Sequence, residues 1–256
     1  MGAPFRQNPD VNWVTDKNGI VLGFVTDLGT FVGIPTLDPV TGDLVTPGGS
    51  TFNLGPIVTT WAARAALVSA GQHNAFFTDV GIGGGSHWYY SGGKWRPLGG
   101  KVMLYNLTAP ISTQVTALGV LLSVAIPAGL WQDGDILEWT TSHSKEGGTS
   151  ETATCDWRIG ASDVSIGSAL GLSTSSLATT QTHMNTTGRI RRLTSTTAQN
   201  LSTTGAIGYG QGSYPVGTRT IPDAEAASYW QALGNLNTGA ETLWLRGASL
   251  YLEAGS

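Results

Sequence analysis

The sequence predicts a mainly β protein: a C-terminal antiparallel β-sandwich of jelly-roll-like type, preceded by a short helix, a small aromatic hairpin and an N-terminal β-rich region. Three observations indicate this class. Short apolar or alternating segments recur along the chain, turn residues separate them, and helix signals are rare. Glycine supplies 36 of the 256 residues, which suits many tight turns. The length is sufficient for a sizeable core.

Residues 1–58 are the first predicted region and are rich in β structure. The segment Asn12–Thr26 has the pattern of a hairpin that turns at Lys17-Asn18-Gly19. Turn residues also interrupt Leu37–Val45, and Pro47–Ser50 has the composition of a linker. We therefore expect short paired strands followed by a connection.

Residues 59–100 are predicted to hold a helix and a hairpin. The helix is Thr59–Ala70, which has threonine at its start, alanine and leucine in its body and glycine after its end. Trp88, Tyr90 and Trp95 flank a Ser-Gly-Gly turn signal, so a hairpin would pair their rings across two strands. The alternative is an exposed platform that stacks on sugar rings. We favour the structural hairpin, because cross-strand pairing is a sufficient reason for the rings.

Residues 101–256 are predicted to form the sandwich. A second short helix is expected at Asp223–Leu233, which follows a proline and starts with acidic residues. In two strands, alternation places Leu137, Trp139 and Thr141, and likewise Cys155, Trp157 and Ile159, on one face. The predicted strands are Lys101–Leu107, Thr116–Ile126, Ile136–Ser144, Thr149–Ile159, Arg189–Ser195, Ala198–Tyr209 and Thr242–Glu253.

Composition excludes several classes of partner. Charged residues are only 12% of the chain and the net charge is −4, so no basic stripe is present to bind nucleic acid. The short basic run Arg189–Arg192 fits a strand face or a subunit contact. The longest apolar run, Val115–Leu130, is interrupted by polar residues, glycine and proline, so we expect no membrane insertion. The first residues lack a signal-peptide pattern, so we expect the chain to be made in a cytoplasm and to stay soluble there.

Catalytic and metal motifs are weak. The four histidines form no HExxH motif, no GxSxG motif occurs, and the adjacent Ser86 and His87 would point to opposite faces of a strand. The single Cys155 excludes an intrachain disulfide and CxxC sites. The segment Asp133–Glu138 lacks the later ligands of a calcium loop, and we favour a hairpin turn between two strands. The GxGxG pattern at Gly208–Gly212 has no Rossmann unit around it. We expect no catalytic residue, no metal and no cofactor, and therefore not an enzyme.

Two segments carry a family resemblance. Residues 77–100 contain FTDVG, then GGSHWYY and KWRPLGG. They resemble a segment of tail-fibre and related receptor-binding proteins of tailed bacteriophages, in which a TDVG strand turns into a W-Y-S-G-G-x-W-R-P-x-G-G hairpin. Residues 124–135, with VAIPAGL and then DGD, are similar to the IPAGLL…GD strand and turn that opens the sandwich of many phage structural proteins. This chain has Trp131 and Gln132 where a glycine-bearing turn is common, so its turn can differ.

The resemblance implies a homotrimeric virion protein. Residues 1–58 would attach to other virion proteins, and the C-terminal domain would face outward and bind a glycan or other receptor on the bacterial surface. Few charges and many Ser, Thr and Gly residues suit such an extracellular assembly. We expect the contact residues to be exposed loop aromatics and polar groups, for which the candidates are Trp131, Gln132, His143, Tyr209, Gln211, Tyr214 and Tyr229.

Two alternatives stay open. The protein could be a head fibre, capsid decoration or baseplate protein that binds only other virion proteins. It could also be a glycan-degrading tailspike, which commonly needs a pair of carboxylates in a cleft. The acidic residues here are sparse and lie mostly in turn motifs, so the tailspike ranks last.

Overall fold

The computed structural model describes residues 12–15, 21–25, 31–33, 36–37, 44–45, 51–52, 55–147, 150–166, 173–201 and 217–255, with the backbone alone for those before 55 and for 173–175. Contacts divide the chain into two compact units, residues 1–56 and 57–256. The three-part division at residues 58 and 100 remains a prediction.

The N-terminal unit contains two small antiparallel sheets. In the first, the β1–β2 pair matches the hairpin predicted within residues 12–26. The predicted turn at residues 17–19 and the linker at 47–50 lie outside the described residues. The first sheet consists of β1 (Asn12–Thr15), β2 (Val21–Val25) and β3 (Phe31–Gly33), and the second of β4 (Thr36–Leu37), β5 (Leu44–Val45) and β6 (Thr51–Phe52).

A small module of helix and sheet opens the second unit. Its helical turns are η1 (Trp61–Ala63) and α1 (Arg64–Ser69), which confirm the helix predicted over 59–70. Its sheet has the order β10-β9-β8-β7. The predicted hairpin forms, with a two-glycine turn whose residues both have positive φ, as a type I′ turn requires. The strands are β7 (Ile57–Val58), β8 (Asn74–Phe77), β9 (Ser86–Ser91) and β10 (Lys94–Pro97).

Aromatic rings form the core of this module. The Trp61 ring lies 4.9 Å from Phe77 and 4.7 Å from Trp88, measured between centroids. Trp88 and Trp95 are buried, and Tyr90 packs against Trp95 at 5.6 Å. The rings therefore have the structural role favoured above, because a module this small has little aliphatic surface to bury.

The main domain is a β-sandwich. One sheet has the order β11-β21-β14-β17-β18-β19, with β12 also paired to β21. The other has the order β13-β20-β15-β16. The first consists of β11 (Lys101–Asn106), β12 (Ile111–Thr113), β14 (Ile136–Glu146), β17 (His183–Thr194), β18 (Thr197–Asn200), β19 (Gly217–Thr220) and β21 (Thr242–Glu253), and the second of β13 (Gly119–Ile126), β15 (Ala153–Gly160), β16 (Ser173–Leu177) and β20 (Ser228–Leu236).

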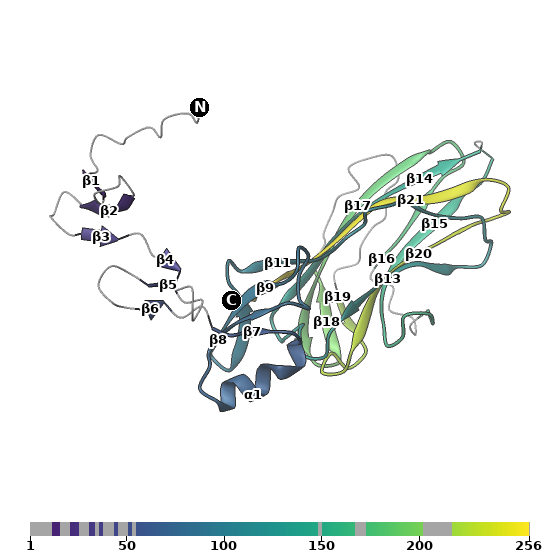
Figure 1. Ribbon diagram of the computed structural model, residues 1–256. Coiled ribbons are helices and arrows are strands. Elements are labelled where there is room, and N and C mark those ends of the chain that lie inside the picture. The colour runs from purple at the N-terminus through teal and green to yellow at the C-terminus, as the bar shows by residue number, and fades with distance from the viewer. Residues whose placement is uncertain are drawn as a thin grey trace. The chain divides into compact units, whose positions relative to one another are not determined.

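The connections make the sandwich jelly-roll-like. The chain alternates between the two sheets from β12 to β15, passes from β16 to β17, continues through β18 and β19 in the sheet of β17, and then crosses to β20 and back to β21. The resulting four-strand orders β12-β21-β14-β17 and β13-β20-β15-β16 are those of a double Greek key. Figure 1 shows α1 with β7 and β8 beside one end of this sandwich. The predicted fold class is confirmed.

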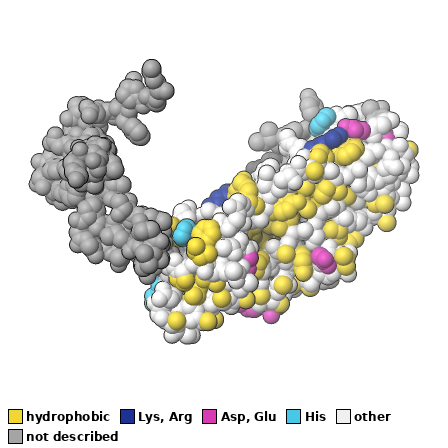
Figure 2. All heavy atoms as spheres, viewed as in Figure 1, with side chains coloured by type: hydrophobic (Ala, Val, Ile, Leu, Met, Phe, Trp, Pro, Cys, Tyr) yellow, Lys and Arg dark blue, Asp and Glu magenta, His cyan; other side chains and the backbone are white. Residues whose placement is uncertain are grey.

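Indole rings fill the space between the sheets. Trp139 of β14 and Trp230 of β20 lie 6.2 Å apart between ring centroids, although their strands belong to different sheets. The predicted alternation holds, since Leu137, Trp139 and Thr141 are buried. The surface carries few charges, and the face visible in Figure 2 presents mainly hydrophobic and uncharged side chains.

Two local predictions are wrong. The helix expected over 223–233 is absent, because Ser228 begins β20, which pairs with β13 and β15 on its two sides. Those ladders outweigh the local helix preference. Residues 133–135 do not turn a hairpin either, because β13 and β14 lie in different sheets. Within the described residues, β18 ends at Asn200, short of the strand predicted to reach Tyr209.

No helix in the part of the chain that the structure describes has the length and apolar character needed to cross a bilayer.

Replacing Gly188 by alanine tests how closely β17 packs against the Trp139 ring. A Cβ at Gly188 would enter the Trp139 indole, whereas a Cβ at Gly217 meets nothing within 4 Å. We expect G188A to lose about 1–3 kcal/mol of unfolding free energy by overpacking. The matched G217A should stay within about 0.5 kcal/mol of the parent protein. Urea denaturation checks both, and equal stabilities would contradict the close contact.

Candidate functional site

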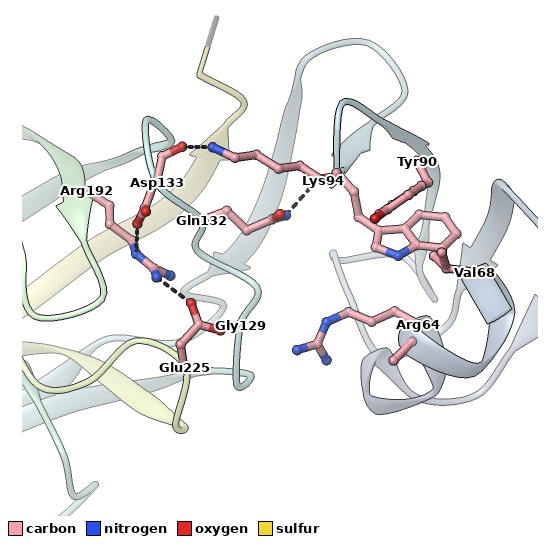
Figure 3. Close-up of a pocket in the computed structure, with 12 residues that line it drawn as sticks. Arg64, Val68, Tyr90, Lys94, Gly129, Gln132, Asp133, Arg192 and Glu225 are labelled. Atoms are coloured by element: carbon pink, nitrogen blue, oxygen red, sulfur yellow. Dashed lines mark hydrogen bonds and ion pairs between the residues drawn. The ribbon is translucent and has the colours of Figure 1, made fainter.

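The main candidate site is a pocket of about 450 Å³ between the helix–hairpin module and one end of the sandwich. Figure 3 shows its walls: α1 and the β9–β10 hairpin on one side, and the β13–β14 connection with Arg192 and Glu225 on the other. Its volume lies in the usual range for small-molecule sites, about 300–1,000 Å³. The lining residues are Arg64, Ala65, Val68, Tyr90, Gly93, Lys94, Trp95, Gly129, Gln132, Asp133, Arg192 and Glu225.

The carboxylate of Asp135 shapes the β13–β14 connection. It accepts a hydrogen bond from the Gln132 amide at 3.0 Å and one from the Gly255 amide at 2.9 Å. The Trp131 indole donates to the Asp135 carbonyl at 3.0 Å. Burial raises the pKa of Asp135, although the two amide hydrogen bonds oppose this. The turn therefore presents Gln132 toward the pocket and turns the Trp131 ring into the core.

Arg192 is a buried cation at the base of this wall. Only 3% of its side chain is exposed, and Figure 3 shows its ion pairs with Asp133 and Glu225. The pair with Asp133 is 2.8 Å long. Its guanidinium also donates to the carbonyls of Trp131 and Thr194. Arg192 therefore joins three separate segments of the sandwich.

Polar contacts attach the hairpin to the sandwich. The Gln132 amide donates to the Trp95 carbonyl at 2.8 Å, and the Lys94 ammonium donates to the Asp133 carbonyl. On the same strand, Arg96 donates to the carbonyl of Gly255. These hydrogen bonds thus connect the hairpin wall of the pocket to the sandwich wall.

Ring surface and polar groups meet in this pocket. Tyr90 is half-buried, and Trp95, which also lines the pocket, is 4% exposed. The Trp95 indole nitrogen has no hydrogen-bond partner among the described residues. Buried polar groups usually have a partner. An aromatic wall with amide, guanidinium, ammonium and carboxylate groups around it can stack on and hydrogen-bond a polar ring.

The structure separates the predicted contact residues. Gln132 lines the pocket, while Tyr229, half-buried in β20, does not. Tyr209, Gln211 and Tyr214 lie outside the described residues, as does the GxGxG pattern. Tyr90 and Trp95, predicted as structural hairpin residues with Trp88, also contribute to the pocket.

Two predicted contact residues are not exposed. Trp131 and His143 both have 0% exposed surface, so the expectation that they lie in exposed loops is wrong. Trp131 faces inward because its indole donates to the Asp135 carbonyl. His143 belongs to the inward-facing positions of β14, in contact with the Trp157 ring at 5.8 Å. Neither imidazole nitrogen has a partner among the described residues, and burial lowers its pKa to about 4.

Sequence reasoning missed most of the charged lining residues. Arg64 is the single charged residue of its predicted helix, and Lys94 stands beside the hairpin turn. Neither carries a motif, and both approach Asp133, Arg192 and Glu225 only in the folded chain. The one available signal was the presence of long cations in two segments without acidic residues, Arg64 in the helix and Lys94 with Arg96 in the hairpin.

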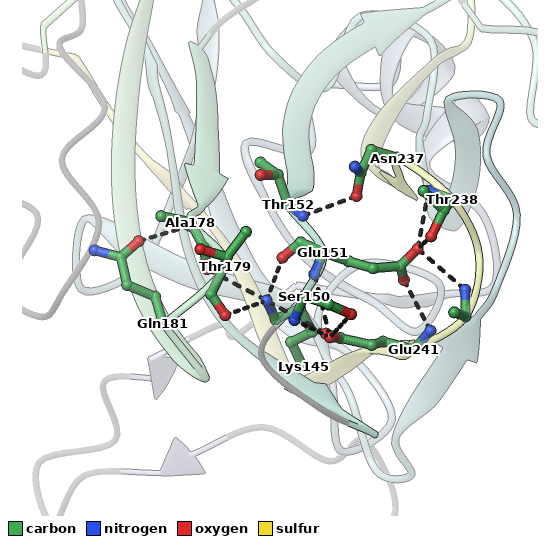
Figure 4. A network of polar contacts seen from close by, with 11 residues as sticks. Lys145, Ser150, Glu151, Thr152, Ala178, Thr179, Gln181, Asn237, Thr238 and Glu241 are labelled. Atoms are coloured by element: carbon green, nitrogen blue, oxygen red, sulfur yellow. Dashed lines mark hydrogen bonds and ion pairs between the residues drawn. The ribbon is translucent and has the colours of Figure 1, made fainter.

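A second polar cluster lies where the β14–β15 and β20–β21 connections meet (Figure 4). The Glu151 carboxylate accepts hydrogen bonds from the amides of Thr238, Ala240 and Glu241, at 2.8–3.0 Å. Glu241 in turn accepts from the Ser150 amide at 2.7 Å and pairs with Lys145 at 3.3 Å. The two glutamates thus clamp the two connections to each other.

Most polar atoms of the clamp find partners within it. Burial raises the pKa of each glutamate, but hydrogen bonds lower it by more. The donors are backbone amides at Glu151, and backbone amides together with Lys145 at Glu241. Both pKa values therefore lie below the ordinary 4.5. The clamp therefore contributes its full stabilisation at pH values above 4.5. It loses this stabilisation as the pH falls through the lowered pKa values of the two glutamates in the folded protein. Because its other carboxylate oxygens have donors and Oε2 of Glu241 faces the Lys145 ammonium at 3.3 Å, we assign it a structural role.

Two observations concern metal binding and thiol chemistry in the described part of the chain. No cluster of three or more His, Cys, Asp or Glu residues there could hold a metal ion. Burial raises the pKa of the Cys155 thiol, so it stays protonated at neutral pH.

Comparisons with known proteins give little. No protein-family model and no curated protein matches the chain. Among solved structures, the CBM2 module of the evolved Dit of Lactobacillus casei BL23 phage J-1 aligns with 10% identity and a TM-score of 0.29, over 66% of this chain and 80% of that one. At so low a TM-score this likeness supports neither a fold nor a function.

Replacing His143 by leucine tests the buried neutral imidazole. Because its folded pKa is near 4 and its ordinary value is 6.5, the native protein loses stability as pH falls through this window. We expect the unfolding free energy of H143L, relative to that of the parent protein, to rise by about 3 kcal/mol between pH 7 and pH 4, at 1.36 kcal/mol per pKa unit. Denaturant titrations at several pH values measure this difference. Parallel pH curves for the two proteins would contradict it.

Removing Lys145 tests the clamp against an exposed pair. Lys145 and Glu241 are almost fully buried, whereas the Lys101–Glu138 pair is partly exposed. We expect K145M to lose at least about three times more unfolding free energy than K101M, since K145M leaves a buried carboxylate without its cation. Thermal unfolding of both variants checks this. Similar losses would show that water replaces Lys145 at little cost.

Proposed function

We propose that the protein is a virion structural protein of tail-fibre or receptor-binding type, which attaches a tailed bacteriophage to a glycan on the host surface. It acts in the virion after assembly in the host cytoplasm. It forms a homotrimer, contacts other virion proteins through residues 1–58, and binds the host through its C-terminal part. It binds rather than catalyses.

The observation that carries this proposal is the pocket between the hairpin and the sandwich. Its lining combines Tyr90 and Trp95 with several polar groups, as recognition of a sugar requires. Part of each wall comes from a segment with a sequence resemblance: residues 77–100 resemble phage tail-fibre and receptor-binding proteins, and residues 124–135 resemble phage structural proteins. Three pockets on one trimer would bind with avidity, so that each could be weak.

A second function is favoured by a different observation. Several large apolar side chains of the module are exposed, among them Ile57 at 77% and Leu98 at 61%. Such surface can serve contact with other virion proteins. A head-fibre, decoration or baseplate role without host binding would use this surface and leave the pocket empty.

Cell binding by labelled full-length protein tests the proposed function. We expect saturable binding to the host strain, weakened about tenfold or more by Y90L, because ring stacking worth ~1 kcal/mol is lost at each of three sites. Tyr89 is the matched control, since it lies in the same strand but is exposed and does not line the pocket. Y89L should bind as the parent protein does.

Sedimentation and thermal unfolding accompany this test. If folded, trimeric protein does not bind the host strain, the purely structural function is favoured. Equal loss in Y89L and Y90L would move the contact from the pocket to the hairpin as a whole.

A further inference from the structure

The charges that line the pocket do not balance. Three cations, Arg64, Lys94 and Arg192, line it together with two acids, Asp133 and Glu225. Both acids form their ion pairs with the buried Arg192. The remaining two cations therefore face the same space as acids that are already engaged.

Arg64 has no carboxylate within ion-pair distance among the described residues. Its guanidinium donates to the Trp61 carbonyl at 3.2 Å and lies 5.3 Å from the Trp61 ring. A guanidinium has five N–H donors in a fixed fork, so most of them have no partner in these contacts. Figure 3 shows the Arg64 side chain reaching from α1 across the pocket toward the opposite wall.

Lys94 reaches the pocket from the hairpin side. Its ammonium donates to the backbone carbonyl of Asp133 and forms no ion pair with a carboxylate in the described part of the chain. An ammonium has three donors, so it can accept a further acceptor group. The contact with the carbonyl holds the cation at the edge of the pocket, where the buried Asp135 carboxylate attracts it without forming an ion pair with it.

Glu225 lies close to Arg64 beside Gly129. A Cβ at Gly129 would collide with the Arg64 guanidinium and come within 3.3 Å of a Glu225 carboxylate oxygen. The absence of a side chain at Gly129 thus lets both groups occupy one wall. Glu225 bonds Arg192 through its other oxygen, so it cannot fully compensate both cations.

We infer that the pocket binds an anionic sugar, one that carries a carboxylate or a phosphate group on its ring or linkage. Arg64 and Lys94 would hold the anion, because a guanidinium matches both groups and an ammonium adds a point charge. Tyr90, which keeps exposed ring surface, would contact the sugar ring, with the buried Trp95 packed behind it. This inference rests on the proposed function and adds the charge of the glycan.

Immobilised polymers test the inference with the full-length protein. The probes are polygalacturonate for carboxylate, glycosylated polyglycerol-phosphate teichoic acid for phosphate, dextran as neutral polysaccharide and polyglutamate as acidic peptide, at low and high salt. We expect retention on at least one anionic glycan polymer, none on dextran, and weaker binding at high salt. The polymer that binds identifies the source of the anion.

Paired variants assign the binding to the two cations. We expect R64Q/K94Q to bind at least about tenfold more weakly, since each charge-assisted hydrogen bond contributes that much or more. R191Q is the matched control: it removes one positive charge from an exposed position of β17 outside this pocket. It should bind within about threefold of the parent protein. K94R, which keeps the charge, should retain binding, and this separates lost charge from lost folding.

The outcomes distinguish this inference from the proposed function. Equal retention on dextran, or cell binding that R64Q/K94Q leaves unchanged, overturns the anionic ligand while host attachment stands. Retention on polyglutamate alone overturns the sugar and points to an acidic protein segment. If the parent protein binds neither host cells nor any polymer, both proposals fail.

Discussion

A buried guanidinium governs the end of the sandwich that carries the pocket. Arg192 is almost completely removed from water, so its donors need partners within the protein. They find them in the Trp131 carbonyl, the Thr194 carbonyl, Asp133 and Glu225. These partners come from three segments, and their convergence sets the wall against which the hairpin docks. The same ion pairs occupy Asp133 and Glu225, and they leave Arg64 and Lys94 without an ion pair to either acid.

Apolar burial gives that wall a rigid support. The domain has few charged residues and one cysteine, so indole rings and backbone ladders carry its stability. Trp139 and Trp230 span the two sheets, and Trp61, Trp88 and Trp95 form the small core of the module. Where charges are buried, as in the clamp of Lys145, Glu151 and Glu241, almost every polar atom has a donor or acceptor beside it. Polar groups that face outward are then free to act in binding.

Local patterns predicted much of this architecture. The helix after residue 59, the glycine turn of the hairpin and the alternation along β14 and β15 all depend on neighbours within a few residues. The second helix failed for the opposite reason. Residues 228–233 have a helical composition, but they lie between two partner strands, and the two ladders exceed the small helix preference. His143 was misplaced because its polar ring was taken as exposed, although the alternation through Leu137, Trp139 and Thr141 continues to residue 143 and places it on the buried face.

The sequence by itself determined the class of the fold, the hairpin with its rings and the low charge of the surface, because turn residues, alternation and composition act locally. Only the tertiary structure decided which charges meet. Arg64, Lys94, Asp133, Arg192 and Glu225 are far apart in the chain and carry no shared motif. Whether a cation is neutralised depends on a partner a few ångströms away, and such distances are set by the packing of module against sandwich.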